Sequence, residues 1–216
     1  MKKIFTLIAM ALMAVSANAQ TTTYAIQGDD ENVGANKSIS AVDGITVTFG
    51  DVEWTVGGSN KDAKEVAGIS LTGKYATTGS NGNPVTFTTT KSGTLTIIFG
   101  GAIATNKKIF MELGETGITG KVLSTGVAQE SGAAPSAEIA AWDGVVYTLE
   151  ANKSYSFKAT GTKWRFAGFK YEAGTAGINS VKATAENTAI YNLAGQQVDK
   201  NYKGVVIQNG KKMIQK

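Results

Sequence analysis

Short runs of alternating apolar and polar side chains recur along the middle of this 216-residue chain. In residues 45–49 and 85–88 every second side chain is apolar and the others are threonines, which is the pattern of a strand with one buried face. Residues 94–99 begin with this alternation and end in a continuous apolar run, which is typical of a central strand covered on both faces or of a local bulge. We predict further strands at residues 52–56, 69–71, 109–113, 145–149, 155–158 and 165–171.

Turn-forming residues separate these runs at short intervals, and the chain contains 26 glycines but only 2 prolines. No segment has the helical period that the crossovers of a parallel sheet require. Nine or ten strands with this spacing therefore predict an all-β fold, an antiparallel β-sandwich with a jelly-roll-like arrangement. Residues 125–141, which are rich in Gly, Ala and Ser, are expected to form a long loop, with room for a helical turn at residues 137–141.

The first 19 residues have the order of a secretory signal peptide: two lysines, an apolar run at residues 4–15 and an Ala-Asn-Ala site that ends at Ala19. We expect cleavage after Ala19, with a retained N-terminal anchor as the alternative. The apolar run is shorter than the ~20 residues of a membrane-spanning helix, so no integral span is expected in the mature chain. The predicted location is secreted or at the cell surface, after export through the periplasm.

The composition changes after Glu172, where small residues indicate a linker. Beyond it, three very short strands are expected at residues 189–193, 204–208 and 212–215, with Asn209-Gly210 as a tight hairpin turn. A unit this small buries little apolar surface, so it is expected to be loosely tethered or to dock on a partner. The predicted organisation is a signal peptide at 1–19, a β-sandwich domain at 20–173, a linker at 174–188 and a β-rich tail at 189–216.

The chain contains no histidine and no cysteine. This removes Ser-His-Asp, Cys-His and zinc-site chemistry, and it leaves the mature fold without disulfides. Carboxylate chemistry of the kind that glycosidases use is the surviving catalytic scheme, but the acidic residues are scattered and no pair has a telling spacing. We therefore predict a non-catalytic protein without a cofactor. The acidic cluster at residues 29–31 leaves a structural calcium site open, although no Asp-x-Asp-x-Asp-Gly loop is present.

The net charge gives no sign of a nucleic-acid partner. Removal of Lys2 and Lys3 with the signal peptide leaves 19 basic residues against 17 acidic ones, so the formal charge falls from +4 to +2. Nucleic-acid binding requires clustered positive charge, and the chain has a single arginine, Arg165.

Aromatic side chains with polar neighbours are the candidate ligand contacts, because sugar C–H faces stack on exposed rings while polar side chains bind the hydroxyls. The candidates are Trp142, Asp143, Tyr75, Trp164 and Arg165. Core packing is the alternative for each ring, and it is the assignment for Trp54, which shares a strand face with two valines.

The segment at residues 161–171 is the densest in aromatic residues, and we expect it to be a closing core strand. Unbroken alternation would place Trp164 and Phe166 on one face and Arg165, Phe169 and Tyr171 on the other. A bulge at Gly168 would switch the facing midway.

Two parts of the chain resemble known families. Residues 147–157 and 161–172 are similar to the last strands of β-sandwich modules in secreted Bacteroidetes proteins, some of which are attached to polysaccharide-degrading enzymes. This carbohydrate-binding-module-like resemblance implies a setting linked to glycans, without implying particular ligand residues.

The tail carries the second resemblance, in Ile-Tyr-Asn-Leu-Ala-Gly-Gln at residues 190–196, Gly-Val-Val-Ile at 204–207 and Asn-Gly-Lys-Lys at 209–212. These motifs resemble the C-terminal sorting domains of the Bacteroidetes type IX secretion system. The chain has Val206 where that pattern usually has an aromatic residue. The resemblance implies contact with the secretion machinery, and a short β-rich tail with exposed edges suits capture by strand addition.

These patterns predict a secreted or cell-surface, non-catalytic β-sandwich that binds glycan or another surface polymer through loop aromatics. A structural or adhesive protein that contacts other proteins is the competing class. A carboxylate-dependent carbohydrate-active enzyme is the more remote alternative.

Overall fold

The computed structural model describes residues 20–39, 44–79, 81–160, 164–174, 190–193, 195–199, 201–208 and 211–215. These residues belong to two compact units, which are divided between Ala176 and Gly177. The predicted signal peptide lies outside the described residues, as does the predicted linker apart from Gly174.

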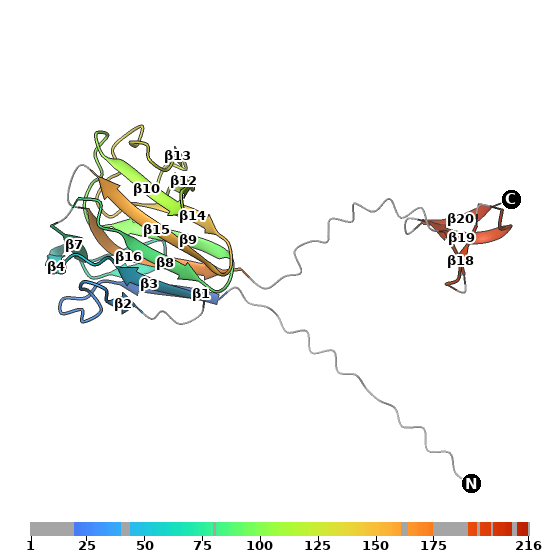
Figure 1. Ribbon diagram of the computed structural model, residues 1–216, viewed down its shortest axis with the longest axis horizontal. Helices are drawn as coiled ribbons and strands as arrows, with labels where there is room; N and C mark the ends of the chain where they lie inside the picture. Colours follow the sequence, from blue (N-terminus) through green and yellow to red (C-terminus); the bar gives the residue numbers. More distant parts are fainter. Residues whose placement is uncertain are drawn as a thin grey trace, which may run out of the picture. The chain divides into compact units, whose positions relative to one another are not determined.

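The first unit is an antiparallel β-sandwich of two sheets on either side of one core, which confirms the predicted fold class (Figure 1). As described, the larger sheet contains β1 (Gln20–Ala25), β4 (Trp54–Gly58), β7 (Lys74–Thr78), β9 (Gly93–Phe99), β12 (Gly120–Val122), β13 (Ala128–Gln129), β14 (Gly144–Leu149) and β16 (Arg165–Ala173). The smaller sheet contains β2 (Ser38–Ile39), β3 (Ile45–Phe49), β8 (Val85–Thr89), β10 (Lys108–Leu113), β11 (Thr116–Gly117) and β15 (Lys153–Thr160).

The strand order is that of a jelly roll. From β7 to β10, successive strands of the two sheets alternate between the layers, so neighbours within a sheet come from distant parts of the chain. The larger sheet has the order β13-β12-β14-β9-β16-β7-β4, with β1 also paired to β16, and the smaller sheet has the order β11-β10-β15-β8-β3-β2. The central strands therefore pair mainly with strands distant in sequence, whereas β2–β3, β10–β11 and β12–β13 are local pairs at the ends of the sheets.

The alternation seen in the sequence fills this core. In β3 and β8 the apolar side chains are buried, whereas the threonines between them are more accessible. Aromatic rings from both sheets meet edge to face: Phe87 contacts Phe166 at 6.2 Å between ring centroids, and Phe157 contacts Trp164 at 5.0 Å. Trp54 is only 3% exposed, which confirms its assignment to the core.

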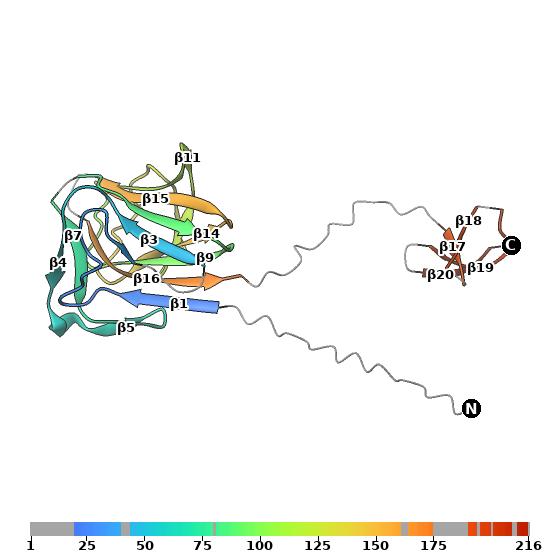
Figure 2. The same ribbon diagram turned by 60° about the horizontal axis from the view of Figure 1, so that its bottom comes forward.

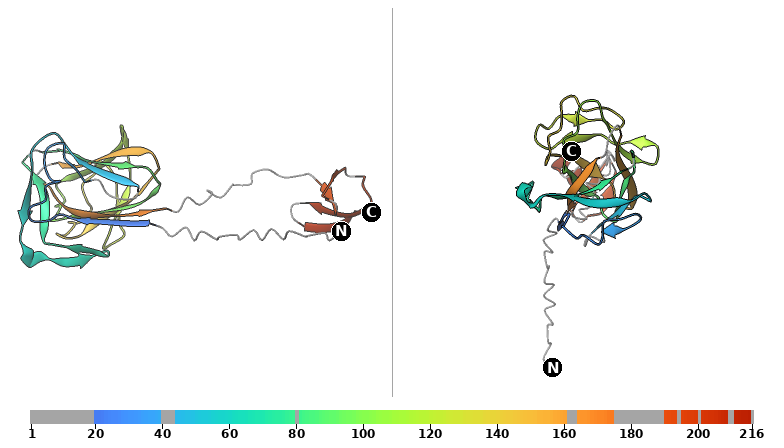
Figure 3. Two further views of the ribbon diagram at one scale, coloured as in Figure 1. Left: turned by 90° about the horizontal axis from the view of Figure 1, so that it is seen from below. Right: turned by 90° about the vertical axis from the view of Figure 1, so that its left-hand side faces the viewer.

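A small second apolar cluster lies on the outer face of the larger sheet. The hairpin of β5 (Lys64–Val66) and β6 (Ile69–Leu71) buries Ile69 and Leu71 with Ile98 and Ala167. Figures 2 and 3 show this hairpin running along β1, outside the two sheets. Ile98 is therefore buried although its neighbours Ile97 and Phe99 point into the sandwich, so of the two alternatives for residues 94–99 the structure has the central strand covered on both faces.

Strand β16 contains the bulge that its sequence suggested. Its pairing with β9 shifts between Phe166 and Gly168, and a Cβ on Gly168 would lie 2.2 Å from the carbonyl oxygen of Tyr24. The shift turns Phe169 and Tyr171 into the core on the same side as Phe166.

Several sequence expectations need correction, and β2, β5, β7, β11, β12 and β13 are strands that the sequence did not predict. Strand β1 was not predicted, because Tyr24 is the only large apolar side chain in Gln-Thr-Thr-Thr-Tyr-Ala. The predicted strand at residues 52–56 begins two residues later, at Trp54, and extends to Gly58. Residues 125–141, all described, form no helical turn; they include β13 and pair Ile139 with Ile103, which fixes the long loop to the sandwich.

The second unit is a four-stranded sheet with the order β18-β17-β19-β20. Its strands are β17 (Ile190–Asn192), β18 (Gln197–Val198), β19 (Gly204–Gln208) and β20 (Lys211–Gln215). Three of them confirm the expected β-rich tail, whereas β18 was not expected. Gln208 pairs with Lys211, and the predicted turn between them lies outside the described residues.

Within the described part of the chain, no helix has the length and apolar character that a membrane crossing requires.

Three tyrosines, of which Tyr147 and Tyr171 are buried and Tyr24 is partly buried, have raised pKa values in this fold. The Tyr24 hydroxyl donates to both carboxylate oxygens of Asp30 (2.8 and 2.7 Å), and burial together with this bond raises the pKa of Tyr24 to about 12. Burial also raises the pKa of Tyr147 and that of Tyr171, whose hydroxyl donates to the Lys91 carbonyl.

We expect the free energy of unfolding to fall as the pH rises above the ordinary tyrosine pKa of about 10. Between this value and about 12, Tyr24 ionises in the unfolded chain but keeps its proton in the folded one, so the folded state binds more protons. Urea unfolding at increasing pH measures the effect, and Tyr24→Phe should make the decline shallower. An unchanged slope in this variant would show that Tyr24 contributes nothing to it.

Candidate functional site

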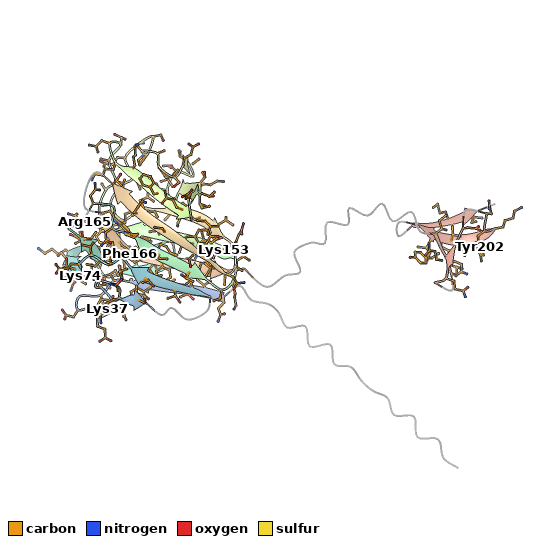
Figure 4. All side chains as sticks on the ribbon, viewed as in Figure 1. Lys37, Lys74, Lys153, Arg165, Phe166 and Tyr202 are labelled. Atoms are coloured by element: carbon orange, nitrogen blue, oxygen red, sulfur yellow. The ribbon has the colours of Figure 1, made fainter. Side chains whose placement is uncertain are left out.

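Three of the five candidate ligand residues meet on the outer face of the larger sheet. The rings of Tyr75, from β7, and Trp142, from the loop before β14, lie 6.5 Å apart at an interplanar angle of 49°. The guanidinium carbon of Arg165, at the start of β16, lies 4.9 Å from the centre of the Tyr75 ring. Figure 4 labels Arg165 at the end of the sandwich away from Lys153. We call Trp142, Tyr75 and Arg165 the aromatic row.

Glycines make room for this row. A Cβ on Gly100 would lie 2.6 Å from Cβ of Tyr75, and one on Gly57 would lie 2.9 Å from the edge of its ring. A Cβ on Gly101 would lie 2.8 Å from Cδ of Arg165. Because real Cβ atoms do not approach so closely, these glycines allow the two side chains to lie flat against the sheet.

Trp142 occupies a backbone position that glycine normally takes. Its N–H donates to the Phe99 carbonyl (2.7 Å), while the Phe99 N–H donates to the Asp143 carbonyl (2.8 Å). Trp142 and Asp143 therefore both lie opposite the single residue Phe99. This is a β-bulge whose first residue has positive φ, and Trp142 has φ of 65°. A bulky residue in that region costs on the order of 1–2 kcal/mol. The fold therefore keeps the Trp142 ring beside Tyr75 at the expense of backbone strain.

Asp143 braces this bulge and does not face the row. Its carboxylate accepts hydrogen bonds from the backbone N–H groups of Ser124 (3.2 Å) and Gly144 (2.7 Å), and from the Ser124 hydroxyl (2.5 Å). It also lines a cavity of about 70 Å³. A cavity of that size is far smaller than ligand pockets of roughly 300 Å³ and more, so it offers no room for a sugar ring.

Trp164 lies in the core and is removed from the ligand site. It is 1% exposed, its indole N–H donates to the Asn83 carbonyl (3.2 Å), and its ring packs edge to face on Trp54 at 5.4 Å. The residue next to it, Arg165, is exposed because neighbouring side chains on a strand point to opposite faces.

The polar edges of the aromatic row have no partners among the described residues. Within that part of the chain, neither the Tyr75 hydroxyl nor the Trp142 indole N–H makes a hydrogen bond, and the Arg165 guanidinium makes neither a hydrogen bond nor a salt bridge. Both rings are partly buried against the outer apolar cluster, whereas Arg165 is exposed. Ordered rings with unused donors form a surface that can stack on a ligand and bond to its polar groups.

Lys74, at the same end of the sandwich in Figure 4, borders an open crevice with Gln27 and Asn60. The crevice is lined by polar and small residues and contains no aromatic ring. It lacks the stacking surface of the aromatic row, so we do not assign the site there.

The acidic cluster at residues 29–31 organises a loop. Besides the two bonds from Tyr24, Asp30 accepts hydrogen bonds from the N–H groups of Gln27 (3.2 Å) and Asn32 (3.1 Å), whereas Asp29 and Glu31 are exposed. Among the described residues, no group of three or more acidic side chains converges as a metal site would require.

The sequence patterns predict the rings of the aromatic row but not the glycines Gly57, Gly100 and Gly101 on which its side chains lie. The pair Gly100–Gly101 directly follows the apolar strand β9, and glycines in such a place can indicate that another side chain lies close to the backbone.

The comparisons with known proteins give no family for this chain: no protein-family model matches it, and no curated protein is significantly similar.

We expect Trp142→Gly to be more stable than Trp142→Ala by about 1 kcal/mol, because glycine tolerates positive φ and alanine does not. The two variants lose the same ring contacts, so the comparison isolates the backbone. Phe110→Gly and Phe110→Ala, in the extended strand β10, are the matched control and should show the reverse order. Urea unfolding measures all four variants, and equal stability of the two Trp142 variants would contradict the strain argument.

Proposed function

We propose that this chain is an exported, non-catalytic β-sandwich that binds glycan or another surface polymer through the aromatic row. The observation that carries the proposal is the contact of Tyr75 with both Trp142 and Arg165, with the polar edges of all three left for a ligand. Rings of this kind stack on the C–H faces of sugars, and their hydrogen-bond donors bind hydroxyl groups.

The backbone at Trp142 supports a binding role. Strained residues persist where the surrounding structure enforces them, and they cluster at ligand sites. A glycine at this position would relieve the backbone strain. If the ring served only to fill the core, a position with ordinary backbone angles would provide the same packing without strain. A tryptophan at this strained position is therefore best explained by the use of its ring at the surface.

The arrangement of the carboxylates supports binding without catalysis. Asp30 and Asp143 are the most buried acidic residues of the described chain, and each already accepts several hydrogen bonds. Neither lies free beside the aromatic row as a general acid or nucleophile would.

The tail is proposed to act in export to the cell surface or the medium. The four-stranded sheet is small, and it leaves Leu193 63% and Ile214 74% exposed. Strand β20 lies at its edge, where unpaired backbone groups can add to a sheet of another protein. These features suit capture by a secretion machinery, in line with the resemblance of the motifs in residues 190–212.

Contact with another protein is the second candidate for the sandwich. Trp, Tyr and Arg are the residues that most often dominate the binding energy of protein interfaces, and the aromatic row contains one of each.

A glycan array probed with the exported chain should identify bound polysaccharides. For the best of them, we expect Trp142→Ala and Tyr75→Ala each to weaken binding about 10-fold or more, because each removes a ring worth roughly 1.5–3 kcal/mol when buried. Calorimetric titration measures the affinities. Phe110→Ala is the matched control: its ring also lies below a cation, Lys158 at 5.1 Å, but on the smaller sheet.

Absence of binding to every glycan on the array would refute the glycan proposal. Capture of a protein partner that Trp142→Ala and Tyr75→Ala both release would then favour the second candidate.

Deletion of residues 189–216 should leave the sandwich in the periplasm, because the unit proposed for capture is gone. Cell fractionation with an antibody to the sandwich measures this, and the full chain is the control. Normal surface delivery of the truncated chain would rule out an export function of the tail.

A further inference from the structure

Arg165 is the only arginine of the chain, and no carboxylate among the described residues forms an ion pair with it. The ion pairs among the described residues are Lys158–Glu112 and Lys170–Glu172. Arg165 takes part in neither. Its side chain is nevertheless positioned, since the guanidinium lies over the Tyr75 ring and Cδ lies close to Gly101.

The smaller sheet contains a similar contact between a cation and an aromatic ring, but there the cation is paired with a carboxylate. Lys158 lies 5.1 Å from the centre of the Phe110 ring, but its ammonium group also bonds Glu112 at 3.1 Å. That cation is already compensated by a carboxylate of the same chain. The Arg165 guanidinium is the corresponding cation on the larger sheet, with the carboxylate missing among the described residues.

We propose that the missing partner is a carboxylate of the ligand: the aromatic row binds an acidic sugar of the uronic acid type within a polysaccharide. This inference rests on the proposed glycan function and specifies its ligand class. Arginine presents a planar fork of N–H donors that matches the two oxygens of a carboxylate, and such bidentate bonds are among the strongest hydrogen bonds in proteins. The guanidinium lies over the Tyr75 ring, and the neighbouring Trp142 ring offers a surface on which the C–H face of the same sugar can stack.

The aromatic rings favour an acidic sugar over an acidic peptide as the source of the carboxylate. An acidic peptide would satisfy the guanidinium as well, but its aspartate and glutamate side chains offer no rigid apolar face to two neighbouring rings. A pyranose that carries a carboxylate joins both features in one residue. An acidic peptide is therefore an outcome for the test to exclude.

Polygalacturonate and its methyl ester provide the test, because they differ only in whether the carboxylate is charged. We expect the full exported chain to bind the free acid about 10-fold or more tightly than the ester, in calorimetric titrations at low ionic strength. Arg165→Gln should reduce this ratio to about 1, and Arg165→Lys should restore it in part, because lysine keeps the charge but not the fork. Lys158→Gln is the matched control and should leave the ratio unchanged.

The outcomes separate this inference from the glycan proposal. Equal binding of the acid and the ester, or a ratio unaffected by Arg165→Gln, would overturn the acidic-sugar inference and leave glycan binding intact. Binding of poly-glutamate as tightly as polygalacturonate would overturn the inference in favour of an acidic peptide. Failure to bind these polymers and any neutral glycan would refute both proposals. Thermal unfolding of each variant checks that the sandwich is still folded.

Discussion

The β-bulge between Phe166 and Gly168 decides which side of the larger sheet each side chain of β16 faces. With regular alternation, Phe169 and Tyr171 would point away from the core that Phe166 fills, and two large rings would be exposed. The bulge returns both rings to the core and is compatible with the close approach of β1, since Gly168 has no Cβ to meet the Tyr24 carbonyl. The burial of these two core rings depends on this one irregularity.

The second bulge, at Trp142 and Asp143, lies opposite Phe99 of β9, the same residue that pairs with Phe166 before the first bulge. Phe99 pairs with Phe166 on one side and faces the Trp142–Asp143 bulge on the other, so both neighbours of β9 leave regular register at the same level. Bulges re-aim side chains, and here the second bulge places the Trp142 ring on the outer face, where alternation along β16 also places Arg165, while Phe99 and Phe166 remain in the core. The aromatic row thus arises where the ladder is interrupted, and it needs no cleft to bring its members together.

Alternation in the sequence was enough to predict the sandwich, because each strand with one buried face has a period of two. The alternation pattern did not predict strand β1, because polar side chains occupy most of its positions. It forms a strand because it pairs with β16, which is far away in sequence. Among the candidate residues, Trp164 and Arg165 were named together although they point to opposite faces. Which of them is exposed depends on the register of β16, and a local pattern does not contain that information. The proximity of Tyr75, Trp142 and Arg165 depends on the jelly-roll crossings, so it was likewise beyond a local reading.

The length of strand β16 gives the distance between the aromatic row and the end of the sandwich where its first and last strands meet. Its nine residues, at roughly 3.3 Å each, separate Arg165 from Ala173 by about 26 Å. Gln20 pairs with Ala173, so the first and last strands of the sandwich meet at the end away from Arg165. A sandwich attached through that end would present the aromatic row at its free end, where a long polymer can approach the rings without crossing the point of attachment. Since a polymer occupies a row of side chains more readily than a closed pocket, two partly buried rings beside one exposed cation suit the polymer ligand proposed above.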